Sequence, residues 1–511
     1  MRLYISWALC MCGFVVTTDI QNTELMLGKQ AFRGPDAQSF YKDSFIGMGH
    51  ALLDINGERQ VQPYKTKNGN YIVFNGEMYD TTIPNDTEYL ANGLETYGVD
   101  FLVHNDWHGS LVWYKPKQKE VFMVRDHFGA KPLWHYQKGS EFTITTSLRS
   151  ILNGEPDNSH EMVYRLNSLL EGDECHIKNI RKVAPGEYHT INLKKKTIVT
   201  GNLWNGFLVE KRPFNIKVFK EKLIESISKI AKTKQKCGLF LSGGLDSTMV
   251  LSVIKDLGLD LTVYICGYDD TKGLYWNHDA FRTESELAVK TCKMWKVPYK
   301  VITLRQELMY HYDREWLNNT RYPWSDRNRR CPRYMLAKFA AKDGCKVIFT
   351  GDSADEIVTG YLHHGKYWEE GYKKNKIKRY QEYKWYPKIR HGADAWNDLL
   401  LGDLLITSEQ NVLATDQTCG MFGMESRPCF LGQNFVKWCY QHDGFFKFKQ
   451  HPEWNTGTYK YLLREVMADY IPEHIRNKKK KVGWSSPWDN NHDRTVKLAR
   501  MLDWQYVQSL L

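Results

Sequence analysis

The sequence predicts a two-part protein of mixed α/β class, with an antiparallel N-terminal half and a parallel-sheet C-terminal half. Up to about residue 205, short alternating strands are separated by turn signals, as in Tyr71-Ile72-Val73-Phe74 before Asn75-Gly76. From about residue 218, short continuous apolar runs alternate with helical patterns. That alternation is typical of a parallel sheet covered by helices on both faces.

In the N-terminal half, further strands are expected at residues 121–124 and 142–145, and a final one near 188–193. We expect these strands to form the two sheets of an αββα sandwich. In the C-terminal half, strands are expected at 238–241, 261–266, 299–303 and 346–350, with a helix over 248–257. After about residue 396 the pattern is mostly helical. No low-complexity linker separates the halves, so we expect them to pack closely.

Composition favours a soluble globular protein, because the 511 residues are 42% apolar and 25% charged. No run approaches the roughly 18 to 20 apolar residues that span a bilayer. The first ten residues resemble a signal sequence only weakly, since no small-residue cleavage site follows them. We therefore expect a cytoplasmic protein with no membrane partner.

The net charge of +11 fits a basic surface around a nucleotide site better than nucleic-acid binding. The densest basic run, Lys478-Lys479-Lys480-Lys481, has no interleaved aromatic residues and no recognisable nucleic-acid module around it. The eleven cysteines are scattered, and no Cys-x2-Cys pair recurs at metal spacing. We expect small-molecule substrates and no zinc.

The sharpest local signal is the loop Ser242-Gly243-Gly244-Leu245-Asp246-Ser247, between a buried strand and a helix. The glycines let the backbone turn tightly, and the helix N-terminus with its free N–H groups forms an anion site. A carboxylate at Asp246 fits such a site if Mg²⁺ joins it to phosphate oxygens. The Gly-Lys-Ser/Thr ending of a P-loop is absent. The loop instead matches the pyrophosphate-binding loop of ATP-pyrophosphatases.

A second acidic loop, Thr350-Gly351-Asp352-Ser353-Ala354-Asp355-Glu356, follows the fourth predicted strand. Loops at the carboxyl ends of parallel strands meet at one edge of the sheet, where ligands bind. Asp355 is therefore expected to face Asp246 and complete a two-carboxylate Mg²⁺ clamp. A helix cap with a solvated acidic first turn would explain part of this run but not all of it.

These motifs resemble those of the asparagine synthetase family, and the match extends in order along nearly the whole chain. The second loop resembles the family's Ser-Gly-Glu-Gly-Ala-Asp-Glu. Other matching segments are Met11-Cys12-Gly13-Phe14, Arg33-Gly34-Pro35-Asp36, Gly49-His50, Asn75-Gly76-Glu77-Met78-Tyr79, Asp86-Thr87-Glu88, Arg125-Asp126-His127-Phe128-Gly129, Gly360-Tyr361 and Gly423-Met424-Glu425-Ser426-Arg427. The resemblance implies a type 2 glutamine amidotransferase domain over residues 12–205 and a synthetase domain over 206–511.

For the first domain, the resemblance implies a nucleophilic Cys12 whose own α-amine acts as the base. Asn75 and Gly76 would hold the oxyanion, and Glu77 with Asp86 would bind the amino end of glutamine. The full set implied to bind glutamine is Arg33, Leu52, Ile55, Asn75, Gly76, Glu77 and Asp86.

For the second domain, the resemblance implies that aspartate is adenylated by ATP and that ammonia then forms the amide. Asp352 and Lys480 are the implied catalytic residues, although the lysine run leaves the assignment open by one or two positions. The residues implied to bind ATP are Leu241, Ser242, Gly243, Gly244, Leu245, Asp246, Ser247, Cys266, Thr350 and Gly351, with Mg²⁺ on Asp246 and Asp355. The family also allows a homodimer.

Several positions depart from the family pattern. Cys12 is preceded by eleven residues, so we expect residues 1–11 to be absent from the active protein, most simply through initiation at Met11. Leu52 stands where the family has the arginine that receives the glutamine α-carboxylate. Asp352 and Ser353 replace the usual Glu and Gly. We expect weak glutaminase activity, with ammonia as a competent nitrogen source.

Two other functions are consistent with part of these motifs. Beta-lactam synthetases and lasso-peptide cyclases use the same Ser-Gly-Gly-x-Asp-Ser loop, but they generally lack the nucleophilic cysteine. A catalytically silent nucleotide-binding homologue would fit Leu52, but it does not explain the retained Asp246, Asp355 and lysine run.

Overall fold

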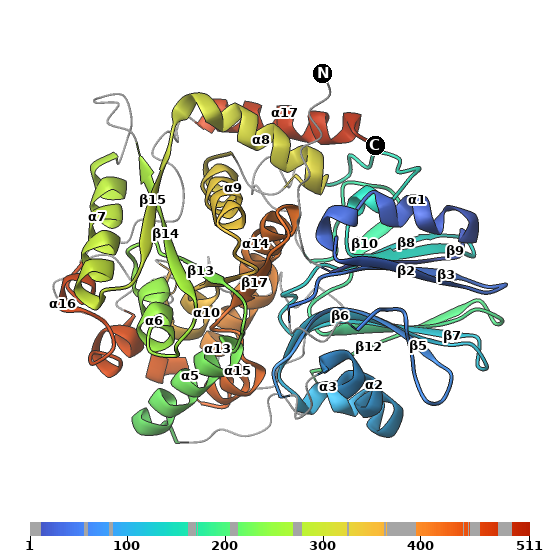
Figure 1. The fold of residues 1–511 in the computed structure, drawn as a ribbon, viewed down its shortest axis with the longest axis horizontal. Coiled ribbons are helices and arrows are strands. Elements are labelled where there is room, and N and C mark those ends of the chain that lie inside the picture. Colours follow the sequence, from blue (N-terminus) through green and yellow to red (C-terminus); the bar gives the residue numbers. More distant parts are fainter. Residues whose placement is uncertain are drawn as a thin grey trace.

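The computed structural model has two halves that lie side by side (Figure 1). It describes residues 12–55, 60–80, 85–161, 170, 172–204, 213–268, 278–323, 327–361, 364, 395–442, 444–447, 449, 460–478 and 493–511. None of the helices within these ranges is long and apolar enough to cross a bilayer.

The N-terminal half is a sandwich of two six-stranded antiparallel sheets, as the sequence predicts. The first sheet, in the order β10-β8-β9-β1-β3-β2, contains β1 (Gly13–Thr17), β2 (Ala37–Lys42), β3 (Gly47–Leu52), β8 (Trp134–Lys138), β9 (Glu141–Thr145) and β10 (Ile180–Lys182). The second, in the order β12-β11-β7-β6-β5-β4, contains β4 (Tyr64–Lys65), β5 (Tyr71–Met78), β6 (Trp107–Lys115), β7 (Glu120–Arg125), β11 (Glu187–Asn192) and β12 (Thr197–Asn202).

Helices cover the outer faces of this sandwich, with α1 on the first sheet and α2 and α3 on the second (Figure 1). These helices are α1 (Thr23–Gly28), α2 (Asp86–Tyr97) and α3 (Asp100–His104), and the short turns are η1 (Ile20–Asn22), η2 (Ala31–Arg33) and η3 (Leu148–Ser150). Alternate apolar residues of both sheets, including Phe14, Val73 and Met123, form the core between them. Burial of these faces fixes the register, because a shift by one residue would turn them to solvent.

The C-terminal half is built on a five-stranded parallel sheet in the order β15-β14-β13-β16-β17. Its strands are β13 (Cys237–Phe240), β14 (Leu261–Tyr268), β15 (Tyr299–Leu304), β16 (Val347–Thr350) and β17 (Glu425–Pro428). Both faces are covered: Leu239 and Val263 belong to one hydrophobic core, and Phe240 and Tyr264 to the other. Burial on both faces explains why these strands are continuous apolar runs.

Helices follow most strands and fill the C-terminal region. They are α5 (Ile216–Ile230), α6 (Leu245–Ile254), α7 (His278–Trp295), α8 (Gln306–Thr320), α9 (Arg327–Lys342), α10 (Ala354–Val358), α13 (Ala395–Gly402), α14 (Glu409–Met421), α15 (Gln433–Tyr440), α16 (Glu473–Arg476) and α17 (Asp493–Ser509). The π-helical segments η4 (Asp403–Ser408) and η6 (Leu462–Val466) and the 3-10 turn η5 (Gly444–Lys447) complete the half.

Two of the described strands differ from what the sequence predicts. β12 follows the strand that was predicted to be the last of the first half, and it lies at the exposed edge of its sheet. β17 lies in the region predicted to be mostly helical, and its sequence Glu-Ser-Arg-Pro lacks the apolar run of a buried strand. Its charged residues are nevertheless buried, because they pair with one another and with the first half.

Buried ion pairs join the two halves along helix α14. Glu409 lies 2.6 Å from the Arg125 guanidinium and 2.7 Å from the Lys182 ammonium. Asp416 lies 3.0 Å from Arg33 and 3.0 Å from Lys131. Both carboxylates come from the C-terminal half and all four cations from the N-terminal half. The close packing of the halves predicted from the sequence is therefore observed, and each of the two carboxylates pairs with two cations across the interface.

Candidate active sites

The predicted pyrophosphate loop joins β13 to α6 in a compact hydrogen-bonded turn. The Ser242 hydroxyl lies 3.1 Å from that of Ser247 and accepts a hydrogen bond from the Gly244 backbone N–H at 3.2 Å. Gly243 has φ +73°, and a side chain there would collide with the backbone carbonyl of Glu284 on α7. The glycine is therefore required by both backbone conformation and close approach.

The second acidic loop lies against the first, as the parallel-sheet arrangement predicts. A Cβ at Gly351 would come within 2.7 Å of the Ser247 backbone nitrogen, so the two loops are in direct contact. Asp246 and Asp355 converge on one cation, the ammonium of Lys460, at 2.6 Å from Asp246 Oδ2 and 2.7 Å from Asp355 Oδ1. Two carboxylates that reach one point can hold Mg²⁺ together with phosphate oxygens and water.

Lys460 is surrounded by protein, with a side chain that is 6% exposed. Burial alone would lower the pKa of Lys460, but the two carboxylates raise this pKa above its usual value. The lysine is therefore a permanent positive charge at neutral pH.

Asp352 lies behind this pair, on the side of helix α14. Its carboxylate accepts a hydrogen bond from the Thr415 hydroxyl at 3.2 Å, and Arg333 Nε in turn donates to that hydroxyl at 3.2 Å. Burial lowers the pKa of Arg333 to about 10, and the Asp352 charge partly offsets this effect. Ser353 has φ +72°, which explains why the related motif carries glycine at this position.

The remaining predicted nucleotide residues lie around these loops. Leu241 is buried at the end of β13, and Thr350 ends β16. Cys266 is buried in the core between the sheet and helices α8 and α9, and its backbone carbonyl accepts a hydrogen bond from Ser285. Lys480 lies outside the described residues. Lys478, at the beginning of the same run, contacts Glu284 beside the pyrophosphate loop.

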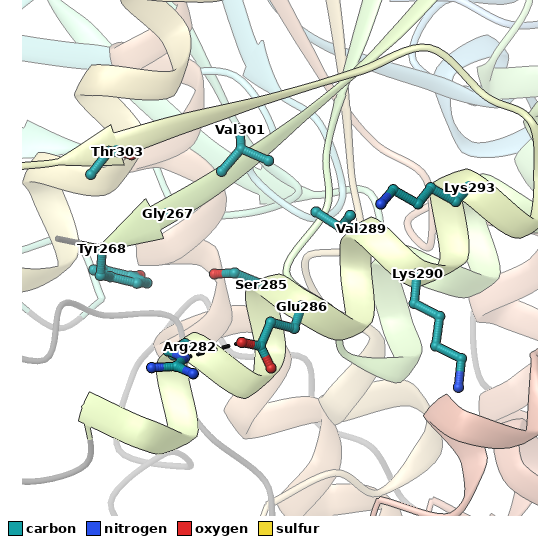
Figure 2. A pocket seen from close by; sticks show the side chains of 10 residues that line it. All are labelled: Gly267, Tyr268, Arg282, Ser285, Glu286, Val289, Lys290, Lys293, Val301 and Thr303. Carbon is teal, nitrogen blue, oxygen red and sulfur yellow. Dashed lines mark hydrogen bonds and ion pairs between the residues drawn. The ribbon is translucent and has the colours of Figure 1, made fainter. Parts of the chain in front are cut away.

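A separate hollow of about 500 Å³ lies between α7 and the ends of β14 and β15 (Figure 2). Its walls are apolar at Val289 and Val301, and Arg282 and Glu286 form a 3.0 Å ion pair at its rim. None of the predicted nucleotide residues lines it. Cys266 immediately precedes Gly267 of this hollow, but its side chain packs in the core on the other face of the sheet.

In the N-terminal half, Cys12 lies directly before β1 at a small pocket. Its Sγ accepts a hydrogen bond from the Leu53 backbone N–H at 3.3 Å. Burial raises the pKa of the Cys12 thiol to about 12. At neutral pH the group is thus a thiol, and a base must remove its proton before it can act as a nucleophile.

The residues predicted to hold the oxyanion and the substrate amine line the same pocket. The Asn75 side-chain nitrogen is buried and, within the described part of the chain, has no hydrogen-bond partner. A Cβ at Gly76 would collide with the carbonyl oxygen of His108, so the backbone approaches β6 closely there. The full lining is Cys12, Leu52, Leu53, Asp54, Ile55, Gln60, Gln62, Phe74, Asn75, Gly76, Glu77, Asp86, Thr87 and Glu425.

Acidic side chains dominate this pocket. Burial, followed by the nearby Glu425, raises the pKa of Asp86 to about 6. Glu77 and Glu425 share the Arg427 guanidinium, at 3.0 Å and 2.7 Å. Because β17 supplies Glu425 and Arg427, the pocket contains groups from both halves.

Leu52, at the position of the arginine that the resemblance led us to expect, is a buried residue that lines this pocket. Arg33 does not line the pocket. Its guanidinium pairs with Asp416, and its Nε donates to the Cys12 carbonyl oxygen at 3.2 Å. Arg59, the other arginine close in sequence, lies outside the described residues.

Two family models match the chain, one on each half. Residues 11–204 match a glutamine amidotransferase domain, and residues 218–509 match asparagine synthase. The second match alone covers more than half of the chain.

The chain belongs to the asparagine synthase family.

Similar proteins in this family include the glutamine-hydrolysing asparagine synthetase 1 of Bacillus subtilis, which is 22% identical over 92% of this chain and 86% of its own length. The chicken glutamine-hydrolysing asparagine synthetase is also 22% identical, over 88% of this chain and 78% of its own. A solved structure of the allosteric regulatory enzyme of purine biosynthesis aligns at 11% identity and a TM-score of 0.29, covering 57% of this chain and 80% of that one.

Two features of this asparagine synthase family member escaped the sequence analysis. Lys460 is far from both loops in sequence, and a single lysine before an apolar helical segment carries no signal of its own. Arg427 was noted as part of a motif without a role. Its position in Glu425-Ser426-Arg427, with alternate charges of opposite sign, could have predicted a buried ion pair.

Proposed function

We propose that this chain is an ATP-dependent asparagine synthetase that adenylates the side chain of aspartate with displacement of pyrophosphate, and that ammonia then forms the amide and displaces AMP. The convergence of Asp246 and Asp355 beside the pyrophosphate loop carries this proposal. When bound there, Mg²⁺ would neutralise charge that develops as pyrophosphate leaves. The loop N–H groups and the start of α6 orient the phosphates.

Asp352 is suited to act on the acyl-adenylate or on the incoming amine. The Thr415 hydroxyl holds one of its oxygens and leaves the other for substrate. Its side chain is one methylene shorter than the family's glutamate, and a bridging water can make up that distance. The lysine run at 478–481 supplies further positive charge for pyrophosphate.

We propose that the first half, residues 12–205, supplies ammonia from glutamine when Cys12 is the first residue. The free α-amine would then remove the thiol proton, which the raised pKa of Cys12 makes necessary. Asn75 and Gly76 would stabilise the oxyanion. With Leu52 in the pocket, glutamine binds weakly and free ammonia serves the second half, residues 206–511, directly.

The decisive experiment measures AMP, pyrophosphate and asparagine from the full chain supplied with MgATP, ammonia and aspartate. We expect the three products in equal amounts, with none formed when aspartate is omitted. Glutamate in place of aspartate is the matched control, since it differs by one methylene. AMP formation that does not depend on aspartate would overturn the proposal.

A further inference from the structure

Lys460 has no part in the steps above, yet it is the residue that Asp246 and Asp355 share. Its ammonium lies 2.6 Å from Asp246 Oδ2 and 2.7 Å from Asp355 Oδ1. It comes from the segment that begins η6, more than 200 residues after the pyrophosphate loop and about 100 after the second loop. Three distant segments thus meet at one point.

The ammonium and a magnesium ion cannot both use this point. Mg²⁺ binds carboxylate oxygens at about 2.0–2.1 Å in a strict octahedron. A cation already within 2.6–2.7 Å of the same oxygens occupies the space where the metal would stand. Repulsion between the two positive charges adds to this overlap.

The two carboxylates, Asp246 and Asp355, also need a neighbouring cation when no metal is bound. Two like charges this close raise each other's cost of ionisation unless an opposite charge lies between them. In the absence of metal, Lys460 supplies that charge in a buried setting where water screens it little.

The surrounding backbone is shaped for the lysine contact. A Cβ at Gly360 would collide with Asp355 Oδ1 and come within 2.6 Å of Lys460 Cε. Any larger residue at Gly360 would therefore push the carboxylate and the lysine apart. Lys460 itself has φ +48°, a conformation that non-glycine residues seldom adopt.

We infer that Lys460 is an exchangeable counter-ion, which holds the two carboxylates together without metal and moves to phosphate oxygens when Mg²⁺ and ATP enter. This inference rests on the proposed magnesium role of Asp246 and Asp355. A lysine ammonium is a compact point charge that suits phosphate oxygens, and ATP brings more negative charge than the metal removes. Lys460 therefore weakens the binding of the metal alone and strengthens the binding of the metal together with the nucleotide.

The first test titrates the full chain with Mn²⁺ alone, as a spectroscopic substitute for Mg²⁺, and measures free metal by electron paramagnetic resonance. Lys460→Met should bind Mn²⁺ at least about tenfold more tightly than the parent, because the competing charge is gone. Lys460→Arg keeps the charge and should bind as weakly as the parent. Equal or weaker binding by Lys460→Met would overturn the inference.

Lys449→Met is the matched control, because Lys449 forms a 2.7 Å pair with Glu465 in the same region and its side chain is exposed. It should leave Mn²⁺ binding unchanged. Addition of ATP should reverse the order, with Lys460→Met binding Mn·ATP about tenfold more weakly than the parent. Unchanged Mn·ATP binding would contradict the predicted movement to phosphate.

A second test uses the unmodified protein and so does not depend on the folding of a variant. Reductive dimethylation followed by peptide mass spectrometry should label Lys460 slowly without metal and several-fold faster with Mg²⁺ alone. No increase with Mg²⁺ would overturn the inference. Neither measurement involves aspartate, so failure here is distinguishable from failure of the aspartate-dependent AMP assay.

Discussion

The two candidate sites treat charge in opposite ways. At the nucleotide loops, two carboxylates converge on one lysine, which neutralises part of their negative charge before any ligand arrives. In the glutamine pocket, Glu77 and Glu425 share Arg427, whereas Asp86 has its pKa raised by burial and by Glu425. Leu52 adds an apolar side chain to the lining of this pocket.

This contrast is the reason why we expect the two proposed activities to differ in strength. A site for a zwitterion such as glutamine needs charges of both signs, one for the amine and one for the carboxylate. The described lining of the pocket contains carboxylates but no arginine or lysine, and the neighbouring Arg427 guanidinium pairs with two of those carboxylates, Glu77 and Glu425. The nucleotide loops instead combine backbone N–H groups with the carboxylates of Asp246 and Asp355, which lie against the Lys460 ammonium.

The largest effect is expected when a carboxylate of the proposed nucleotide site is removed. Asp355→Asn should lower aspartate-dependent pyrophosphate release by roughly 100- to 1,000-fold, because it removes a charge that orients metal and phosphates. Release of glutamate from glutamine, measured in the same preparation, should change little. An equal loss in both reactions would indicate that the variant disturbs the fold instead of the site.

A smaller effect is expected when an arginine is introduced into the proposed glutamine pocket. Leu52→Arg should lower the KM for glutamine by about 10- to 100-fold, since an arginine–carboxylate contact contributes about 1.5–3 kcal/mol. Steady-state glutamine-dependent asparagine formation measures this gain. Leu52→Met, which conserves volume, should leave KM unchanged, and adding Cys12→Ala to Leu52→Arg should abolish the gain. No improvement with arginine would show that another group already receives the carboxylate.

The smallest effect is a pH dependence confined to the glutamine side. Because the pKa of Asp86 is raised to about 6, the carboxylate loses its charge as the pH falls below that value. The KM for glutamine should then rise, by about tenfold per pH unit at most, while above pH 7 it should be flat. Glutamate release at several pH values measures this, and Asp86→Asn should remove the dependence. A flat profile in the parent would show that Asp86 does not bind the amine.

The nucleotide loops were predictable because their geometry follows from local rules. A strand, a glycine turn and a helix place Asp246 at the sheet edge, and the same rule brings Asp355 beside it. The antiparallel half was predictable for a similar reason, since alternation and turns mark β5, β7 and β9.

The contacts that complete each site were not predictable, because they depend on how distant segments pack. Lys460 reaches the carboxylates from outside both loops, and Glu425 reaches the glutamine pocket from the other half of the chain. β17 was not predicted for a related reason: its charged side chains are buried because Arg427 pairs with Glu425 on the same strand and with Glu77 across the interface.

Helix α14 has contacts with both candidate sites. Its neighbouring residues face different sites, since Thr415 donates to Asp352 and Asp416 holds Arg33, which donates to the Cys12 carbonyl oxygen. A ligand that displaces Asp352 therefore acts on the same turn of helix that anchors the segment around Cys12. Linkage is reciprocal: if a bound nucleotide changes the affinity for glutamine by some factor, bound glutamine must change the affinity for the nucleotide by the same factor.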